Sequence, residues 1–136
     1  MAEGEARDPV PDPQDPDRLI TDFAERVPDV LRAAVVASDG VLVAVSDRTQ
    51  PDQLEQLSAI TAGLVALASA AARIFDGGTV IQALVTMARG TFVIMAIDQG
   101  SSLAVLTTAT ADLDTVAYEM TLLVEEAGGT FTPPAR

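Results

Sequence analysis

The sequence contains neither cysteine nor histidine. The chain therefore has no disulfide, no thiolate nucleophile, no imidazole base and no metal site built from cysteine or histidine ligands. Catalytic arrangements that combine serine, histidine and aspartate, or cysteine and histidine, are excluded for the same reason. Composition alone thus removes two large classes of enzyme and the common zinc sites.

Aromatic and basic residues are also scarce. The chain has no tryptophan, one tyrosine and four phenylalanines, so its core has to be built from alanine, valine, leucine and isoleucine. Its eight basic residues are all arginine, and against 20 acidic residues they leave a net charge of −12. A surface with this excess of negative charge repels phosphate backbones and anionic lipids. Nucleic acids and membrane surfaces are therefore not expected as partners.

We find no hydrophobic segment of the kind that targets or anchors a chain. The first eighteen residues are polar and rich in proline, without the apolar stretch of a secretory signal. The most apolar run, residues 57–72, is shorter than the ~20 residues that span a bilayer. We expect a cytoplasmic protein without membrane insertion.

The residues that are present are sufficient for one folded domain. The chain has 136 residues, of which 49% are apolar, and this suffices to bury a single core without disulfides. Residues 1–15 combine prolines with acids and are predicted to be a disordered acidic tail. The folded domain is predicted to span residues 16–129, and residues 130–136 are predicted to be a flexible C-terminal tail.

Periodic apolar residues and their boundaries indicate the order of helices and strands. Helices are predicted over 16–27, about 51–75 and about 111–127. Strands are predicted over 31–38, 41–47, 79–88, 91–98 and 102–108. The strand at 31–38 is apolar on both faces, which favours a position inside the sheet.

The turn signals between these strands predict how they pair. Asp39-Gly40 is typical of a two-residue type I′ hairpin turn. Arg89-Gly90 and residues 99–101 are interpreted as further tight turns, and such short links join antiparallel neighbours. We therefore expect an α/β (α+β) fold: a five-stranded antiparallel sheet with the long helix on one face and the two terminal helices on the other.

The long helix carries two stripes that differ in side-chain size. The bulky stripe is expected to pack on the sheet and consists of Leu57, Ile60, Leu64, Leu67, Ala71 and Ile74. The small stripe would let another helix come close and consists of Ala59, Ala62, Gly63, Ala66 and Ala70. Because the helix has almost no polar side between Gln56 and Arg73, we expect it to be covered twice, by the sheet and by a second copy of itself.

The remaining polar features do not combine into an active site. The Gly-Gly pair at 77–78 is not followed by the Gly-Lys-Ser/Thr of a phosphate-binding loop, and we interpret it as a helix stop. The carboxylate pairs Asp112/Asp114 and Glu125/Glu126 suit a helix dipole and a solvated face better than an acid-base cleft. We therefore expect no catalytic residue, no cofactor and no metal site, and the chain is predicted not to be an enzyme.

Several longer segments resemble one known family. They are AAVVASDGVLVAVS (33–46), LSAITAGLVALASAAARIFDGGTV (57–80), VTMARGTFVIMAI (85–97), SLAVLTTATADLDTVAYEM (102–120) and TLLVEEAG (121–128). In this order they resemble the bacterial roadblock (dynein light chain-related) family of longin-like and profilin-like three-layer domains. The likeness is closest to the actinobacterial branch, similar to the MglB-type regulators of Ras-like GTPases. Its most specific part is the succession of RG turn, LAVL strand and VAYEM helix.

The resemblance implies a homodimer in which the strand after the long helix pairs with its symmetry mate and the long helices pack together. The interface residues implied in this chain are Ala59, Ala62, Gly63, Ala66, Ala70, Val80, Gln82, Leu84 and Thr86. The resemblance also implies that the dimer binds a Ras-like small GTPase and regulates its nucleotide cycle or location in a bacterial signalling system. Arg73 and Arg89 are candidate contacts with an acidic GTPase surface, or else solvated charges.

Two other functions remain open at this stage. A PAS-like small-molecule sensor also uses a small antiparallel sheet with flanking helices. The scarcity of aromatic residues and the absence of histidine argue against a haem or flavin cavity in it. A dimer adaptor within a histidine-kinase-type complex, partnered by a sensor-kinase-like protein, differs from the GTPase regulator only in its partner.

Overall fold

The computed structural model describes residues 15–46, 51–98 and 100–131. The predicted acidic tail falls almost wholly on residues 1–14, outside the described residues. The elements in chain order are α2 (Pro16–Arg26), β1 (Val30–Ala37), β2 (Leu42–Val45), α3 (Pro51–Ile74), β3 (Gln82–Met87), β4 (Gly90–Asp98), β5 (Ser101–Thr108), α4 (Leu113–Ala127) and the 3₁₀ turn η1 (Gly128–Phe131).

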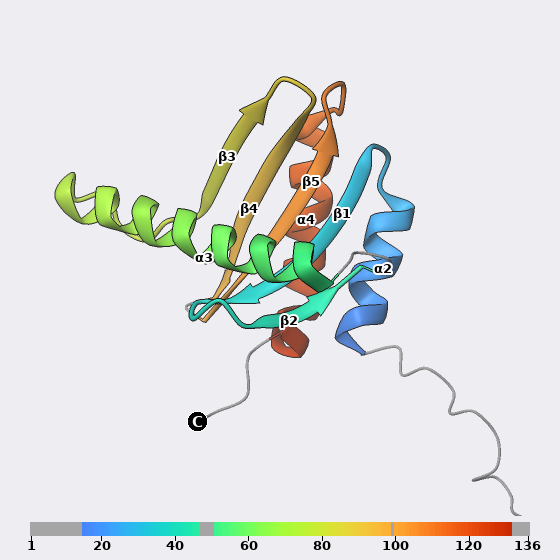
Figure 1. The fold of residues 1–136 in the computed structure, drawn as a ribbon, viewed down its shortest axis with the longest axis horizontal. Helices are drawn as coiled ribbons and strands as arrows, with labels where there is room; N and C mark the ends of the chain where they lie inside the picture. The colour runs from blue at the N-terminus through green and yellow to red at the C-terminus, as the bar shows by residue number, and fades with distance from the viewer. Residues whose placement is uncertain (1–14, 47–50, 99, 132–136) are drawn as a thin grey trace, which may run out of the picture.

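The five strands form one antiparallel sheet in the order β2-β1-β5-β4-β3. β1 pairs with both β2 and β5, which confirms its predicted position inside the sheet. α3 crosses one face of the sheet, whereas α2 and α4 cover the other face (Figure 1). The predicted fold class, element order and layering are confirmed.

The two faces of the sheet are buried to different extents. The main core lies between the sheet and the helices α2 and α4, and its buried side chains are Ile20, Phe23, Val27, Ala33, Val35, Ala44, Val93, Met95, Leu103, Val105, Val116, Met120, Leu123, Ala127 and Phe131. The cluster under α3 has three buried side chains, Phe92, Ile94 and Ala104, among the described residues. Because alternate strand residues point to opposite faces, the two clusters lie on opposite sides of the sheet. The side under α3 has the smaller buried cluster and is therefore the more thinly packed of the two.

The loop between β1 and β2 differs from the predicted type I′ turn. Gly40 has a positive φ of 87°, whereas Asp39 is not among the described non-glycine residues with positive φ. The Gly40 N–H donates to Ala37 O at 2.9 Å, and the Ala37 N–H donates to Val41 O at 2.8 Å. This is the three-residue loop in which a turn is followed by one left-handed glycine. The type I′ prediction is wrong because only one of the two positions adopts a left-handed conformation.

Gly90 was predicted to be a turn residue, but it belongs to a strand. Met87 pairs directly with Gly90, so the turn consists of Ala88 and Arg89, and Gly90 is the first residue of β4. Gly90 is buried, and a Cβ added to it would lie 2.6 Å from the backbone oxygen of Thr107. The glycine is therefore required for the close approach of β4 to β5.

Replacing Gly90 by alanine is expected to destabilise the domain by about 1–3 kcal/mol, because the clash is with backbone and cannot be relieved by a rotamer change. Urea unfolding measures this loss. Gly129→Ala is the matched control, since a Cβ there meets nothing within 4 Å, and we expect it to change stability by less than about 0.5 kcal/mol. Equal stabilities of the two variants would contradict the close approach.

The N-terminus of α4 is capped by Asp112. The Thr115 hydroxyl donates to Asp112 Oδ2 at 3.0 Å, and the N–H groups of Thr115 and Asp114 donate to Oδ1 at 3.3 and 3.1 Å. The hydrogen bond from the Thr115 side chain, followed by that from its backbone, holds the pKa of Asp112 below its usual value. At α2, Asp15 occupies the cap position, but its side chain makes no capping hydrogen bond.

The folded part of the chain extends beyond the boundary predicted at residue 129. η1 continues directly from α4, and the Phe131 side chain is completely buried in the main core. The Ser101 hydroxyl also donates to Phe131 O at 3.4 Å. The C-terminal tail predicted over 130–136 therefore begins no earlier than residue 132, and residues 132–136 lie outside the described residues.

Candidate functional site

Exposed bulky apolar side chains are concentrated on α3, on β3 and in the segment between them. Eight of the eleven such side chains in the described residues lie in this part of the chain, on α3 and on both faces of the edge strand β3, and we call them together the α3–β3 surface. They are Ile60, Leu67, Ile74, Phe75, Ile81, Leu84, Val85 and Met87. Concentrated exposed apolar area of this kind marks sites of interaction.

The orientation of α3 corrects the prediction for its bulky stripe. Ser58 and Thr61 face the sheet and are 4% and 1% exposed, whereas Leu67 and Ile74 are 70% and 77% exposed. The Thr61 hydroxyl donates to Leu57 O at 2.7 Å, which satisfies it inside the helix and permits its burial. The C-terminal part of α3 extends beyond β3, so no sheet lies beneath it (Figure 1). The bulky stripe therefore packs on the sheet only in part.

The small stripe is exposed at three of its five positions. Ala59, Gly63 and Ala66 are exposed, and a Cβ added to Gly63 would meet nothing within 4 Å. Ala70 is half-buried. Ala62 is half-buried as well and points toward the β1–β2 hairpin, where its Cβ lies 3.9 Å from the position of a Cβ added to Gly40. Ala62 is thus on the inner side of α3, unlike the predicted outer position.

β3 supplies the second part of the surface as an edge strand. Among the described residues it pairs with β4 alone. Leu84 lies opposite Val93, a residue of the main core, so it projects on the α4 side, together with the exposed Gln82 and Thr86. Val80 precedes the strand and is half-buried. The unpaired edge offers backbone hydrogen bonds to another strand.

An apolar groove of about 520 Å³ opens beside α3. Its walls come from α3, β1, β3, β4 and β5. Arg32 and Gln53 are its polar lining residues, and the apolar ones include Leu57, Ile60, Leu64, Val85, Met87, Phe92 and Leu106. The groove is continuous with the α3–β3 surface, because Ile60, Val85 and Met87 belong to both. The sequence did not reveal this groove, since its residues come from separate elements and are brought together only by the crossing of α3 over the sheet.

The exposure of α3 is unusual for a helix of this composition. By length and composition, Asp52–Ile74 is long and apolar enough to cross a membrane. Only 11% of its most apolar stretch is buried in the protomer, so most of this apolar helix is exposed. A helix that packs inside a soluble domain is normally covered on its apolar side. An apolar helix that lies across a folded sheet with so little cover is typical of an interaction surface.

The two predicted partner-binding arginines lie on separate elements. Arg73 is exposed in the last turn of α3 and lines a shallow hollow with Asp76. Arg89 is exposed in the turn between β3 and β4. Within residues 15–46, 51–98 and 100–131, no three acidic residues are grouped to hold a metal ion.

Comparison with known proteins shows the family. The model of the Roadblock/LC7 domain family matches residues 16–107, which is more than half of the chain. The chain belongs to the Roadblock/LC7 family. A comparison with curated proteins gives no match.

Three solved structures illustrate the likeness. A Roadblock/LC7 domain from Streptomyces avermitilis is 32% identical, with a TM-score of 0.77 over 81% of this chain and 92% of that one. MglB of Myxococcus xanthus is 16% identical, with a TM-score of 0.77 over 85% and 93% of the two chains. MglB in a tetrameric arrangement is 13% identical, with a TM-score of 0.77 over 90% and 93%. The two MglB structures show the shared fold.

Membership of the Roadblock/LC7 family agrees with the resemblance in sequence. The Streptomyces relative makes the actinobacterial branch plausible. Roadblock domains are generally non-catalytic and regulatory and act through protein contacts. The roadblock fold takes the place of the PAS-like alternative.

Proposed function

We propose that the chain forms a homodimer through the α3–β3 surface and that the dimer binds a Ras-like small GTPase. The observation that carries the dimer is the exposed apolar surface on α3 and β3 beside an unpaired strand edge. Burial of apolar area stabilises association by roughly 25 cal/mol per Å² before the costs of ordering are subtracted. An unpaired edge that meets its own copy gains backbone hydrogen bonds as well.

A two-fold axis beside β3 would cover the exposed side chains of α3 and pair the edge of β3 at the same time. It pairs β3 with the β3 of the second copy in antiparallel fashion and makes one sheet across the two protomers. The part of α3 that extends beyond β3 (Figure 1) then lies over the sheet of the second copy. The apolar groove beside α3 would receive the bulky side chains of the other α3, among them Leu67 and Ile74. This arrangement explains why α3 is so poorly covered in a single protomer.

The GTPase is the proposed partner of the dimer because roadblock domains of the MglB type regulate Ras-like GTPases, as the resemblance in sequence implies. The chain itself has no phosphate-binding loop, so it would act on the nucleotide cycle or the location of its partner. The paired α3 helices and the adjoining strands are the proposed docking face. We place the complex in the cytoplasm, and the net charge of −12 disfavours an anionic lipid surface as the cover of α3.

The test is binding of the purified protein to the Ras-like GTPase encoded nearest to it, loaded with GDP or with a non-hydrolysable GTP analogue. We expect binding to depend on the nucleotide. Arg73→Glu and Arg89→Glu are expected to weaken it about tenfold if these arginines meet an acidic surface. Arg18→Glu on α2 is the matched control, because Arg18 pairs only with Asp22 on its own helix in the described residues.

Absence of binding in both nucleotide states would overturn the GTPase proposal while leaving the fold and the dimer intact. The remaining role would then be that of a dimer adaptor for a sensor-kinase-type complex. Isothermal titration with the cytoplasmic part of the neighbouring kinase-like protein would be the next experiment, since the two roles differ in the partner alone.

A further inference from the structure

A second cavity, of about 280 Å³, lies on the other flank of α3 from the apolar groove. The groove borders the beginning of β4 at Phe92, whereas this cavity borders its end, at Ala96 and Asp98. Its walls also come from α3, from the start of β5 and from the segment before β3. We call it the hydroxyl pocket, because six of its lining residues carry a hydroxyl: Ser38, Thr61, Ser69, Thr79, Ser101 and Ser102.

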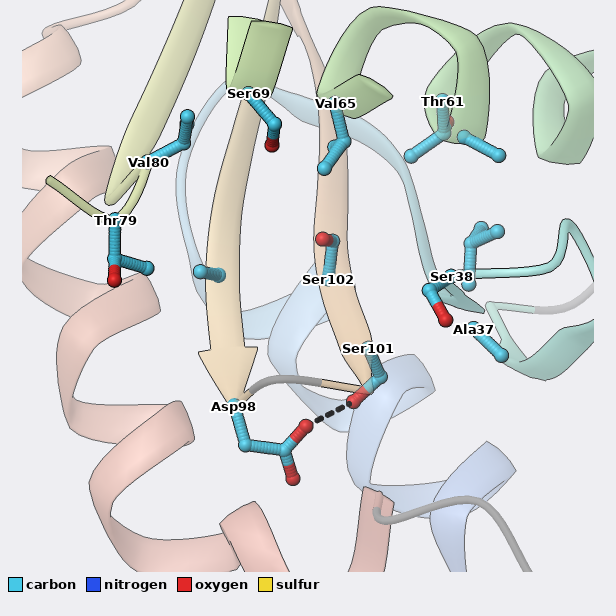
Figure 2. A pocket seen from close by; sticks show the side chains of 13 residues that line it. Ala37, Ser38, Thr61, Val65, Ser69, Thr79, Val80, Asp98, Ser101 and Ser102 are labelled. Carbon is cyan, nitrogen blue, oxygen red and sulfur yellow. Dashed lines mark hydrogen bonds between the residues drawn. The ribbon is translucent and has the colours of Figure 1, made fainter. Parts of the chain in front are cut away.

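The hydroxyls converge on the cavity from opposite walls. In Figure 2, Ser69 points from α3 toward the sheet, and Ser102 points from β5 toward α3. Ser102 is 7% exposed, and its hydroxyl remains accessible from the cavity that it faces. A hydroxyl with this orientation can accept a hydrogen bond from a donor group placed in the cavity.

The charge of the pocket selects the kind of group that fits. Asp98 is the one ionisable side chain among its described lining residues, and it lies at the foot of the cavity, hydrogen-bonded to Ser101 (Figure 2). The Gly100 N–H also donates to Asp98 Oδ1 at 2.7 Å, which fixes the carboxylate in place. An exposed carboxylate at the foot of a cavity lined by hydroxyl groups attracts a cation that carries several N–H donors and repels an anion.

We propose that the hydroxyl pocket binds the guanidinium or ammonium group of an arginine or lysine side chain of a partner protein. The cavity is just below the size range of small-molecule pockets, roughly 300–1,000 Å³, and so matches one inserted side chain better than a metabolite. The aliphatic part of such a side chain would pack on Val65 and Val80, which line the same cavity. The proposal for this pocket does not depend on whether the partner protein is a GTPase.

The experiment is an NMR titration of the ¹⁵N-labelled full chain with N-acetyl-L-arginine amide. We expect saturable shifts in the millimolar range at the amides of Ser69, Ser101 and Ser102. N-acetyl-L-citrulline amide has the same shape without the charge, and we expect it to bind at least tenfold more weakly. Inorganic phosphate is expected to cause no saturable shift at these amides. N-acetyl-L-lysine amide measures how much the planar guanidinium adds to the charge.

Three variants make the proposal falsifiable at the level of single atoms. Asp98→Asn removes the charge while its side-chain oxygen still accepts from Gly100, and we expect about tenfold weaker binding of the arginine amide. Ser102→Ala removes the hydroxyl, with an expected loss of about fivefold. Glu125→Gln on the exposed face of α4 is the charge-matched control and should leave binding unchanged. Thermal melts establish that each variant is folded.

The outcomes separate the proposal from its alternatives. Equal binding of the citrulline and arginine amides would overturn recognition of charge. Saturable shifts caused by phosphate at the same three amides would show that the pocket binds an anion and would refute its preference for a cation. An arginine affinity unchanged in folded Asp98→Asn would place the cation elsewhere, and an absence of shifts with every probe would show that the pocket does not take a basic side chain.

Discussion

Replacing Leu67 by glutamate is expected to convert the proposed dimer into a monomer without unfolding the protomer. Leu67 is 70% exposed on the outer side of α3, so its replacement removes no contact of the protomer core. In the dimer the same side chain is buried, and a central apolar contact contributes about 2 kcal/mol or more. Two-fold symmetry introduces the substitution twice, which gives about 4 kcal/mol, or a roughly thousandfold weaker dimer.

Light scattering coupled to size-exclusion chromatography measures this change, from twice the chain mass to 14.1 kDa. Leu31→Glu is the matched control, because Leu31 is 54% exposed on β1, away from the α3–β3 surface. The control is expected to keep the mass of the dimer. An unchanged mass for Leu67→Glu would show that α3 is not in the interface, and a monomeric unsubstituted chain would refute the dimer itself.

The position best suited to such a test was not evident from the sequence. Helical periodicity showed that α3 is apolar on two sides, but it could not show which side meets the sheet. The polar residues Ser58 and Thr61 are buried, and the Thr61 hydroxyl is satisfied by the backbone of its own helix. Ala62, a predicted interface residue, faces the hairpin instead, so a charge there would test the folding of the protomer.

The overall fold, in contrast, could be predicted because its signals are local. Apolar periodicity and short links between strands predict the elements and their antiparallel neighbours without knowledge of distant contacts. The surfaces depend on distant contacts. The extension of α3 beyond β3 is set by the angle at which the helix crosses the sheet, and no local pattern contains that angle. The groove and the hydroxyl pocket follow from the same crossing and therefore required the structure.

The end of the domain illustrates the same limit at a single residue. Two glycines followed by threonine and prolines are typical of a chain terminus, and Phe131 is a lone aromatic within that context. Its burial depends on the space that the main core leaves beside the start of β5, where Ser101 donates to Phe131 O. A single apolar residue has no periodicity, so the sequence contained no signal for its burial.

Replacing Phe131 by alanine is therefore expected to have a large effect on stability, although the residue lies in a segment predicted to be flexible. Removal of a fully buried phenylalanine side chain costs about 3–5 kcal/mol, because apolar contacts are lost and a cavity remains. This is a large fraction of the roughly 5–15 kcal/mol by which domains are stable. Urea unfolding should show a much lower midpoint with an unchanged slope.

Phe75→Ala is the matched control, since Phe75 is 80% exposed just after α3. Because Phe75 also belongs to the α3–β3 surface, both substitutions should be made in the monomeric Leu67→Glu background, where association does not add to the free energy of unfolding. We expect a change of less than about 0.5 kcal/mol for Phe75→Ala. If Phe131→Ala costs no more than that, the segment after α4 is not part of the core, and the domain ends where the two glycines predicted.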